Sequence, residues 1–245
     1  MFKKKYILEI GFTSVKESKI LEYILQGLEK EGKKYFIVTP NPEILMLANS
    51  SPDYRNILNS AKLALPDGIG VMMAGKILGR ELKQRIQGVD FVESLCRAVA
   101  EKPITVGFLG AGPRIAEQTA ERLKRKLPNL KVVFTASGDP DDKTVDLVKD
   151  GKKEIDILFV AFGSPKQEIW IYENLEKLPV KVVIGVGGAF DFISGKVKRA
   201  HAFIRNMGFE WLFRLISQPW RAKRQVALIK FIYLVFKERL KRSDV

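Results

Sequence analysis

Asp67 is the side chain in this sequence whose setting is most typical of an acid–base catalyst. It follows Pro66 at the end of the apolar run LALPDG, and Gly68 comes directly after it. A carboxylate at the carboxyl end of a strand projects from the rim of a sheet, where it can accept a proton from a sugar hydroxyl or bind a metal ion. An aspartate there also commonly caps the helix that follows. The local sequence leaves these three roles open.

Neutral polar side chains follow two other apolar runs. Thr39 and Asn41 belong to TPNP, which follows YFIV, and Gln167 follows Lys166 in FGSPKQE. Hydroxyl and amide groups can bind the hydroxyls and acetamide of a sugar, although the same groups often cap helices or form turns. We therefore treat Thr39, Asn41 and Gln167 as candidate substrate contacts.

Glycine-rich turns indicate a nucleotide or anion site. GFLGAG contains Gly110 and Gly112, and GVGGAFD contains Gly187 and Asp191. Backbone N–H groups in such turns can approach a phosphate, while Asp191 could bind a uracil or a ribose, or cap a turn. The dinucleotide pattern G-x-G-x-x-G is incomplete, because Ile115 occupies the third glycine position.

The sequence offers no common metal-binding pattern. Cys96 and His201 are the only residues of their types, which excludes multi-histidine and multi-cysteine sites. Asp139 and Asp141 flank a proline at an expected surface turn, so we do not interpret them as a metal-binding pair. Without a metal, cationic side chains must neutralise a departing diphosphate. The candidates for that role are Arg85, Arg214, Arg221 and Arg224.

Apolar runs that alternate with helical patterns carry these residues. The runs cover residues 6–12, 35–39, 63–68, 104–112, 131–138, 155–163 and 181–190. This alternation predicts a Rossmann-like, mostly parallel α/β sheet with helices on both faces, over residues 1–195. Because ligands bind outside the carboxyl ends of such strands, the polar and glycine-rich turns should converge on one crevice.

Residues 196–245 form a basic, apolar tail that differs from the rest of the chain. They hold 13 of the 42 Lys and Arg residues and 3 of the 28 Asp and Glu residues, in a protein of net charge +14. The run from Val226 to Phe236 is too short to span a bilayer, which needs roughly 20 residues. A basic helix with aromatic and aliphatic residues is typical of binding at an anionic membrane surface. A purely solubilising tail would avoid those apolar residues, and we expect this one to fold as helices, including one over residues 209–216.

Composition limits the protein class further. A chain of 245 residues with 46% hydrophobic residues can bury a full core and have residues left for an appendage. The single cysteine fits a reducing compartment, and the lysine-rich start is not followed by a cleavage site for export. We therefore expect a cytoplasmic protein that binds the inner face of the cell membrane peripherally.

Several motifs together resemble the WecG/TagA/CpsF family of glycosyltransferases. They are TPNPEI, LPDGIGV, RIQGVDF, FLGAGP, AFGSPKQEIW, GVGGAFDFISGKVKRA and GFEWLFRL, in this order between about residues 6 and 224. The resemblance implies an inverting transfer from a UDP-linked N-acetylhexosamine, with no metal and no cofactor. In the TagA branch, UDP-N-acetylmannosamine donates to the 4-hydroxyl of GlcNAc on undecaprenyl diphosphate, in the synthesis of wall teichoic acid.

The resemblance also implies roles for individual residues. Asp67 is similar to the general base of the family. Thr39, Asn41 and Gln167 are similar to its substrate contacts. The residues that resemble its diphosphate contacts are Arg85, Arg214, Arg221 and Arg224.

Two rival functions rest on single features. GFLGAG with an acidic residue after the next strand, Asp139, would suit a nucleotide-dependent oxidoreductase, but the incomplete glycine pattern argues against it. The basic tail would suit a nucleic-acid binder, whereas we expect lipid and no nucleic acid as its partner. Another donor sugar is compatible with the sequence, and so is a homo-oligomer.

Overall fold

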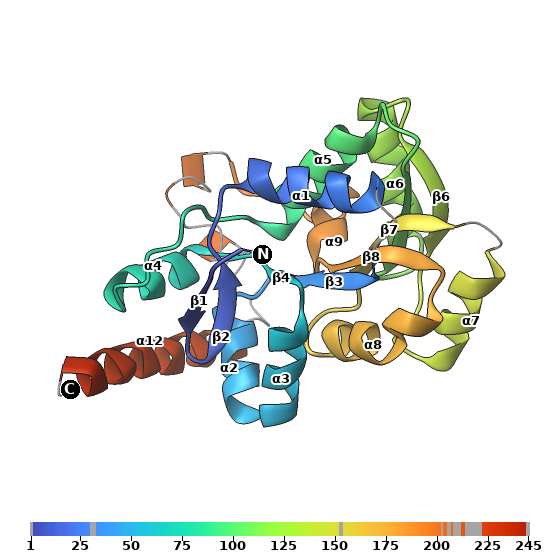
Figure 1. Cartoon of the computed structure of the whole chain (residues 1–245). Coiled ribbons are helices and arrows are strands. Elements are labelled where there is room, and N and C mark those ends of the chain that lie inside the picture. Colours follow the sequence, from blue (N-terminus) through green and yellow to red (C-terminus); the bar gives the residue numbers. More distant parts are fainter. Residues whose placement is uncertain are drawn as a thin grey trace.

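The structure is a computed structural model that describes residues 2–29, 33–151, 154–201, 203–204, 207, 212–213 and 222–243. In the last of these segments, side chains are described from 227 to 241. Figure 1 shows helices on both sides of a central sheet, as the sequence predicts, with a long C-terminal helix at one end.

A hairpin at the N-terminus corrects one prediction. YILEIGF is not a single strand but splits into β1 (Lys4–Ile7) and β2 (Ile10–Thr13), which pair antiparallel. Leu8 and Glu9 form the two-residue turn with φ of 46° and 64°, the left-handed geometry that tight hairpins favour. The sequence suggested a single strand because the turn consists of Leu8 and Glu9. Neither is a glycine or an asparagine, the residues that usually mark such a turn.

Six parallel strands form the main sheet in the order β4-β3-β8-β7-β5-β6. The strands are β3 (Tyr35–Val38), β4 (Leu63–Ala64), β5 (Thr105–Gly110), β6 (Lys131–Ala136), β7 (Ile155–Ala161) and β8 (Val180–Gly185). Every residue of β7 is buried, as expected for a strand covered on both faces. The central strands β7 and β8 therefore hold the loops that follow them at the middle of the carboxyl edge.

Helices cover the two faces of the sheet in two groups (Figure 1). One face carries α1 (Glu17–Glu29), α5 (Gly88–Val99), α6 (Ile115–Lys126) and α9 (Ala189–Ile193). The other carries α2 (Pro42–Ser50), α3 (Pro52–Ser60), α7 (Asp142–Asp150) and α8 (Lys166–Asn174), and its core extends to α4 (Ile69–Ile77). A short 3-10 helix, Leu175–Lys177, follows α8. In β3, Ile37 packs toward the first group, whereas Phe36 and Val38 pack toward the second, as the two-residue period of a strand requires.

The C-terminal helix α12 (Ala222–Ser243) packs on α2 and α4. Its Phe231 and Val235 are buried in the core of that face. Glu238 of α12 accepts a hydrogen bond from Arg80 at 2.5 Å and one from the backbone N–H of Leu8 at 3.2 Å. The part of the tail in α12 thus contributes to the hydrophobic core.

Two further expectations concern the tail. The predicted helix over residues 209–216 falls largely outside the described residues, which include only 212 and 213 of it. None of the helices in the described part of the chain is long and apolar enough to cross a membrane.

Candidate active site

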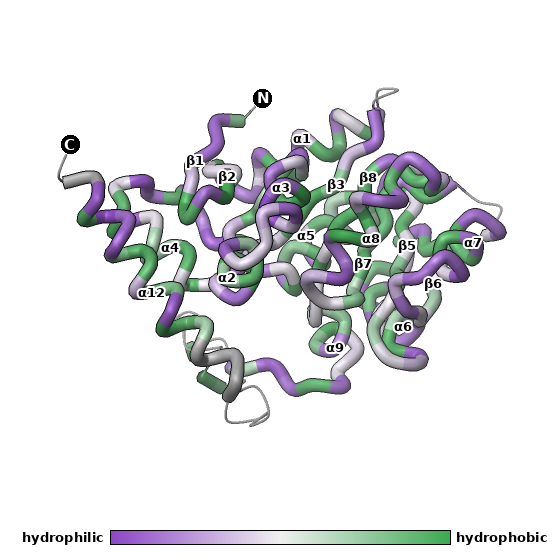
Figure 2. The backbone as a smooth tube through the Cα atoms, turned by 90° about the horizontal axis from the view of Figure 1, so that it is seen from below, coloured by the Kyte–Doolittle hydropathy of each residue, from purple (hydrophilic) through white to green (hydrophobic). Residues whose placement is uncertain are grey.

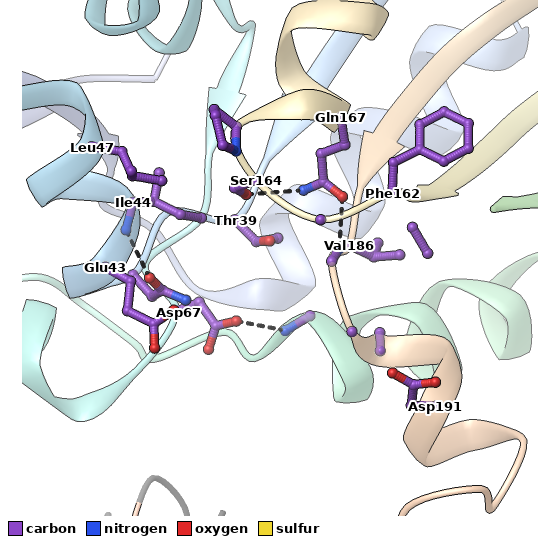
Figure 3. A pocket seen from close by; sticks show the side chains of 18 of the residues that line it. Thr39, Glu43, Ile44, Leu47, Asp67, Phe162, Ser164, Gln167, Val186 and Asp191 are labelled. Carbon is purple, nitrogen blue, oxygen red and sulfur yellow. Dashed lines mark hydrogen bonds between the residues drawn. The ribbon is translucent and has the colours of Figure 1, made fainter. Parts of the chain in front are cut away.

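A cavity of about 770 Å³ opens at the carboxyl edge of the sheet. The loops after five strands line it with Thr39 after β3, Asp67 after β4, Gly112 after β5, Ser164 after β7 and Gly187 after β8. Figure 3 shows these loops surrounding one space, with Asp67 on one side and Asp191 on another. The predicted convergence of the polar and glycine-rich turns is confirmed.

Asp67 lies at the N-terminus of α5. Its Oδ2 accepts a hydrogen bond from the backbone N–H of Gly88 at 3.4 Å (Figure 3). It does not cap the helix that follows, because the N-cap of α4 is Gly68 and no side chain bonds there. Asp67 is half-buried and faces the cavity, where a general base must lie.

Gly88 is a residue whose role the sequence did not indicate. A Cβ at this position would lie 3.4 Å from the carbonyl oxygen of Val186 and 3.8 Å from both Asp67 Oδ2 and Thr39 Oγ1. Because Gly88 has no side chain, the first residue of α5 can pack closely against the segments that follow β3, β4 and β8. The motif RIQGVDF therefore contributes through this glycine to the wall that carries Asp67.

Thr39 and Asn41 line the cavity and also hold its wall together. Thr39 Oγ1 donates to the carbonyl oxygen of Gly185 at 3.1 Å, which ties the end of β3 to the end of β8. Asn41 Oδ1 accepts from the backbone N–H of Ile44 at 3.0 Å and so caps α2. Asn41 thus has the capping role that the sequence left open, and both side chains remain at the surface of the cavity.

Gln167 belongs to a buried hydrogen-bond network. Its Oε1 accepts from the backbone N–H of Gly187 at 3.0 Å, and its Nε2 donates to Glu168 Oε1 at 2.7 Å (the first is drawn in Figure 3). Glu168 also accepts from the hydroxyls of Ser164 at 2.8 Å and Tyr54 at 2.9 Å. The Gln167 side chain is therefore fixed in one orientation, with its carbonyl used to hold the turn after β8.

Glu168 is fully buried, and burial raises the pKa of its carboxyl group. The three donors, Gln167, Ser164 and Tyr54, oppose that rise because they stabilise the charged form. Burial and the nearby Glu168 charge also raise the pKa of the Tyr54 hydroxyl. The sequence contains a signal for this residue, since Glu168 and Ile171 are three positions apart and so share the inward face of α8.

The glycine turns differ in their contributions to the site. Gly112 and Gly187 line the cavity, with Gly187 at φ 53°. Gly110, at φ 100°, does not line it, and a Cβ there would lie 2.8 Å from the Phe162 ring. The absence of a side chain at Gly110 thus allows the turn after β5 to pack closely against Phe162. Asp191 faces the cavity and lies 4.0 Å from Lys196 Nζ.

The candidate cations are only partly placed by the structure. Arg85 is half-buried in the loop before Gly88 and does not line the cavity. Arg214, Arg221 and the side chain of Arg224 lie outside the described residues. Two lysines that we did not select from the sequence, Lys196 and Lys230, line the cavity instead.

The acidic residues after β6 lie away from the cavity, as expected. Asp141 is exposed and caps α7 by accepting from the backbone N–H of Thr144 at 2.9 Å. Hydrogen bonds from Thr144 lower the pKa of Asp141. In the part of the chain that the structure describes, no group of three or more His, Cys, Asp or Glu side chains is arranged to hold a metal ion.

Comparison with known proteins identifies the family. The family model described as "Glycosyl transferase WecG/TagA/CpsF family" matches residues 5–245. The chain belongs to this family. The chain is therefore a glycosyltransferase. This activity suits a cavity at the edge of the sheet that is lined by a carboxylate, amide groups and glycine turns.

Two curated relatives are similar along most of their lengths. The N-acetylglucosaminyldiphosphoundecaprenol N-acetyl-beta-D-mannosaminyltransferase of Bacillus spizizenii (strain ATCC 23059 / NRRL B-14472 / W23) is 35% identical over 233 residues, which cover 95% of this chain and 91% of the relative. The protein of the same name from Bacillus subtilis (strain 168) is 35% identical over 202 residues, which cover 82% and 79%. This glycosyltransferase is therefore similar to both relatives over more than three quarters of each chain.

Proposed function

We propose that this glycosyltransferase transfers N-acetylmannosamine from UDP-N-acetylmannosamine to the 4-hydroxyl of GlcNAc on undecaprenyl diphosphate. The names of the two relatives support the acceptor and the mannosaminyl group. The observation that carries the proposal is the Asp67 carboxylate facing a cavity lined by polar groups and glycine turns. The product is a disaccharide on the lipid diphosphate, as in the linkage unit of wall teichoic acid.

The proposed reaction is a single displacement with inversion. Asp67 takes the proton of the acceptor 4-hydroxyl, and the hydroxyl oxygen attacks the anomeric carbon of the donor sugar. The bond between that carbon and the UDP oxygen breaks, and UDP leaves with the electron pair. Thr39 and Asn41 line the same cavity as Asp67 and are proposed to bind the sugars. Gln167 orients the Gly187 turn and presents its amide edge to the donor.

We propose that cationic side chains stabilise the leaving UDP without a metal. Arg85, Arg214, Arg221 and Arg224 remain the candidates that the family resemblance supplies. Activity should then survive excess EDTA in protein purified without added Mg²⁺ or Mn²⁺. Loss of activity in EDTA with recovery on adding Mn²⁺ would contradict this part of the proposal.

We propose that α12 places the enzyme on the anionic inner surface of the membrane. Its exposed side chains form an apolar stripe at helical spacing, consisting of Ile229, Ile232, Tyr233, Phe236 and Leu240. Lys230, next to Ile229, lines the cavity, so the stripe begins beside the site. A lipid-linked acceptor needs this arrangement, because its sugar must enter the cavity while its lipid stays in the bilayer. Figure 2 shows the mixture of hydrophobic and hydrophilic residues along α12.

A donor screen tests the proposed function directly. The purified protein is incubated with a short-chain lipid diphosphate that carries GlcNAc, and with UDP-ManNAc, UDP-GlcNAc or UDP-glucose. Mass spectrometry should detect the addition of one N-acetylhexosamine from UDP-ManNAc. Linkage analysis of the product should place the added sugar on the 4-hydroxyl. Transfer from UDP-glucose alone would identify a different donor, which is the alternative within this family.

A further inference from the structure

Two lysines provide the cationic side chains among the described residues that line the cavity. Lys230 approaches from α12, and Lys196 approaches from the loop after α9. The carboxylates lining the same cavity are Glu43, Asp67 and Asp191. A negatively charged substrate entering a cavity that also carries carboxylates therefore depends on these cationic side chains.

Lys196 lies over the turn between β5 and α6. Its Nζ is 3.3 Å from the position that a Cβ on Gly112 would occupy, and 4.0 Å from Asp191 Oδ1. The absence of a side chain at Gly112 thus leaves the space in which the ammonium group sits. The distance to Asp191 is long and the Lys196 side chain is 54% exposed, so the ammonium keeps donors available to a ligand.

The loop that carries Lys196 is held by bonds on both sides. The backbone N–H of Val197 donates to the carbonyl oxygen of Asp191 at 2.9 Å. Arg199 makes two hydrogen bonds to the Asp90 carboxylate, at 2.6 and 2.8 Å, a paired geometry that is among the strongest side-chain contacts. Lys196 is therefore presented to the cavity from a fixed backbone.

We propose that Lys196 binds the diphosphate of the UDP-sugar donor, between the Gly112 turn and Asp191. This inference rests on the proposed function. An ammonium group beside a turn without side chains can contact phosphate oxygens as a point charge, and it gains strength as the leaving UDP gains negative charge. Asp191 holds the ammonium in place before the donor binds. Lys196 then supplies a cation to the donor side of the cavity, opposite the wall of α12 that carries Lys230.

Calorimetry with UDP, UMP and uridine tests the proposal on two matched variants. Lys196→Met removes the charge at the cavity, while Lys198→Met removes the same charge two residues away, where the side chain is exposed and does not line the cavity. Lys196→Met should weaken UDP binding by roughly tenfold to a hundredfold, as loss of a hydrogen bond to a charged group implies. Uridine affinity should stay unchanged, and Lys196→Arg should restore most of the UDP affinity.

Each other outcome has a definite meaning. Wild-type affinity for UDP in Lys196→Met would overturn the proposal, as would an equal loss for UDP and uridine, which indicates general damage to the site. Gly112→Ala gives a second test, because its Cβ would lie 3.3 Å from the ammonium group, which must shift by a few tenths of an ångström, and the variant should weaken UDP binding more than uridine binding. A wild-type protein that binds no UDP but transfers sugar from another donor would instead contradict the proposed function.

Discussion

At the scale of single residues, the site depends on which atoms of each polar group are already used. Gln167 accepts from Gly187 with its carbonyl and donates its N–H groups to Glu168 and Ser164, so the second lone pair of its carbonyl oxygen is what remains for a substrate. Asp67 Oδ2 accepts a hydrogen bond of 3.4 Å from the backbone N–H of Gly88, which holds this carboxylate at the cavity wall that α5 begins.

Asp67→Asn tests the proposed base. The amide has nearly the same shape but cannot accept the hydroxyl proton, so kcat should fall by about 10² or more. UDP binding should stay near the wild-type value, because the proposed diphosphate contacts are elsewhere. Transfer is measured on the short-chain acceptor and UDP binding by calorimetry. A variant with near wild-type turnover would remove Asp67 from this role.

Tyr54→Phe tests the buried Glu168 network. Removing the hydroxyl takes one donor from a buried carboxylate, and the free energy of unfolding should fall by about 1–3 kcal/mol at neutral pH. The pKa of Glu168 in the folded protein is raised above its ordinary value, so its burial lowers stability as pH rises through that range. Once Glu168 is protonated, the hydrogen bond from the Tyr54 hydroxyl contributes less to stability, because a neutral carboxyl group gains less from a donor than a carboxylate does.

The destabilisation by Tyr54→Phe should therefore be smaller near pH 4.5 than at pH 7, as measured by denaturant unfolding at both values. Tyr172→Phe is the control, because Tyr172 is an exposed tyrosine of the neighbouring α8. An equal effect at the two pH values would mean that the hydroxyl does not act through the charge of Glu168.

At the scale of elements, the strand-to-helix turns decide what reaches the cavity. The turn after β5 passes through positive φ at Gly110, Ala111 and Arg114. This path brings Gly112 to the cavity and pushes Gly110 against Phe162. The turn after β8 is instead held by the Gln167 side chain. Two glycine-rich segments of similar appearance thus obtain their shapes from different interactions.

Gly110→Ala tests the packing at the first of these turns. Alanine at position 110 would adopt an unfavourable φ of 100°, and its Cβ would also lie 2.8 Å from the Phe162 ring. Gly79→Ala measures the cost of a left-handed φ without a steric contact, because Gly79 has φ 66° and no atom within 4 Å of its Cβ position. The φ of 100° at Gly110 lies outside the left-handed helical region and adds to the cost there. Gly79→Ala should lower the free energy of unfolding by about 1 kcal/mol, and Gly110→Ala should lower it by about 1–3 kcal/mol more. Equal losses would show that Phe162 adjusts freely.

At the scale of the whole molecule, α12 joins the cavity, the core and the proposed membrane surface. Phe231 and Val235 face inward, Lys230 faces the cavity, and the apolar stripe faces outward. Figures 1 and 2 both show α12 beside α2 and α4, at the opposite end of the molecule from α7. A membrane bound by the stripe would therefore lie near the cavity and far from α7.

Leu240→Glu tests the membrane surface. Leu240 is 66% exposed on the stripe, so glutamate there should not disturb the core. It removes an apolar group and adds a charge that anionic lipid repels, which should weaken binding to phosphatidylglycerol vesicles by about tenfold. Leu147→Glu on α7 is the matched control, since Leu147 is also exposed, and should leave vesicle binding unchanged. Equal weakening by both variants would mean that overall charge, and not the stripe, controls binding.

The sequence by itself determined the fold class and the location of the site. Apolar runs alternating with helices require parallel strands, and parallel strands carry all their carboxyl ends to one edge. Asp67, Thr39, Asn41 and Gln167 could be selected for this reason, since each follows a strand. YILEIGF was wrong as a single strand, because a turn made by Leu8 and Glu9 has no local signal.

Only the tertiary structure decided which atoms meet within the site. Tyr54 and Glu168 bond across 114 positions of sequence, and Lys196 reaches the Gly112 turn from another loop. The periodicity of a helix shows which of its faces is buried but not which side chain it meets there. Likewise, the pattern of α12 is that of a surface helix, and its Phe231 and Val235 enter the core because α12 packs on α2 and α4, whose apolar side chains belong to the same cluster. Contacts of this kind depend on the packing of the whole chain, which no local pattern contains.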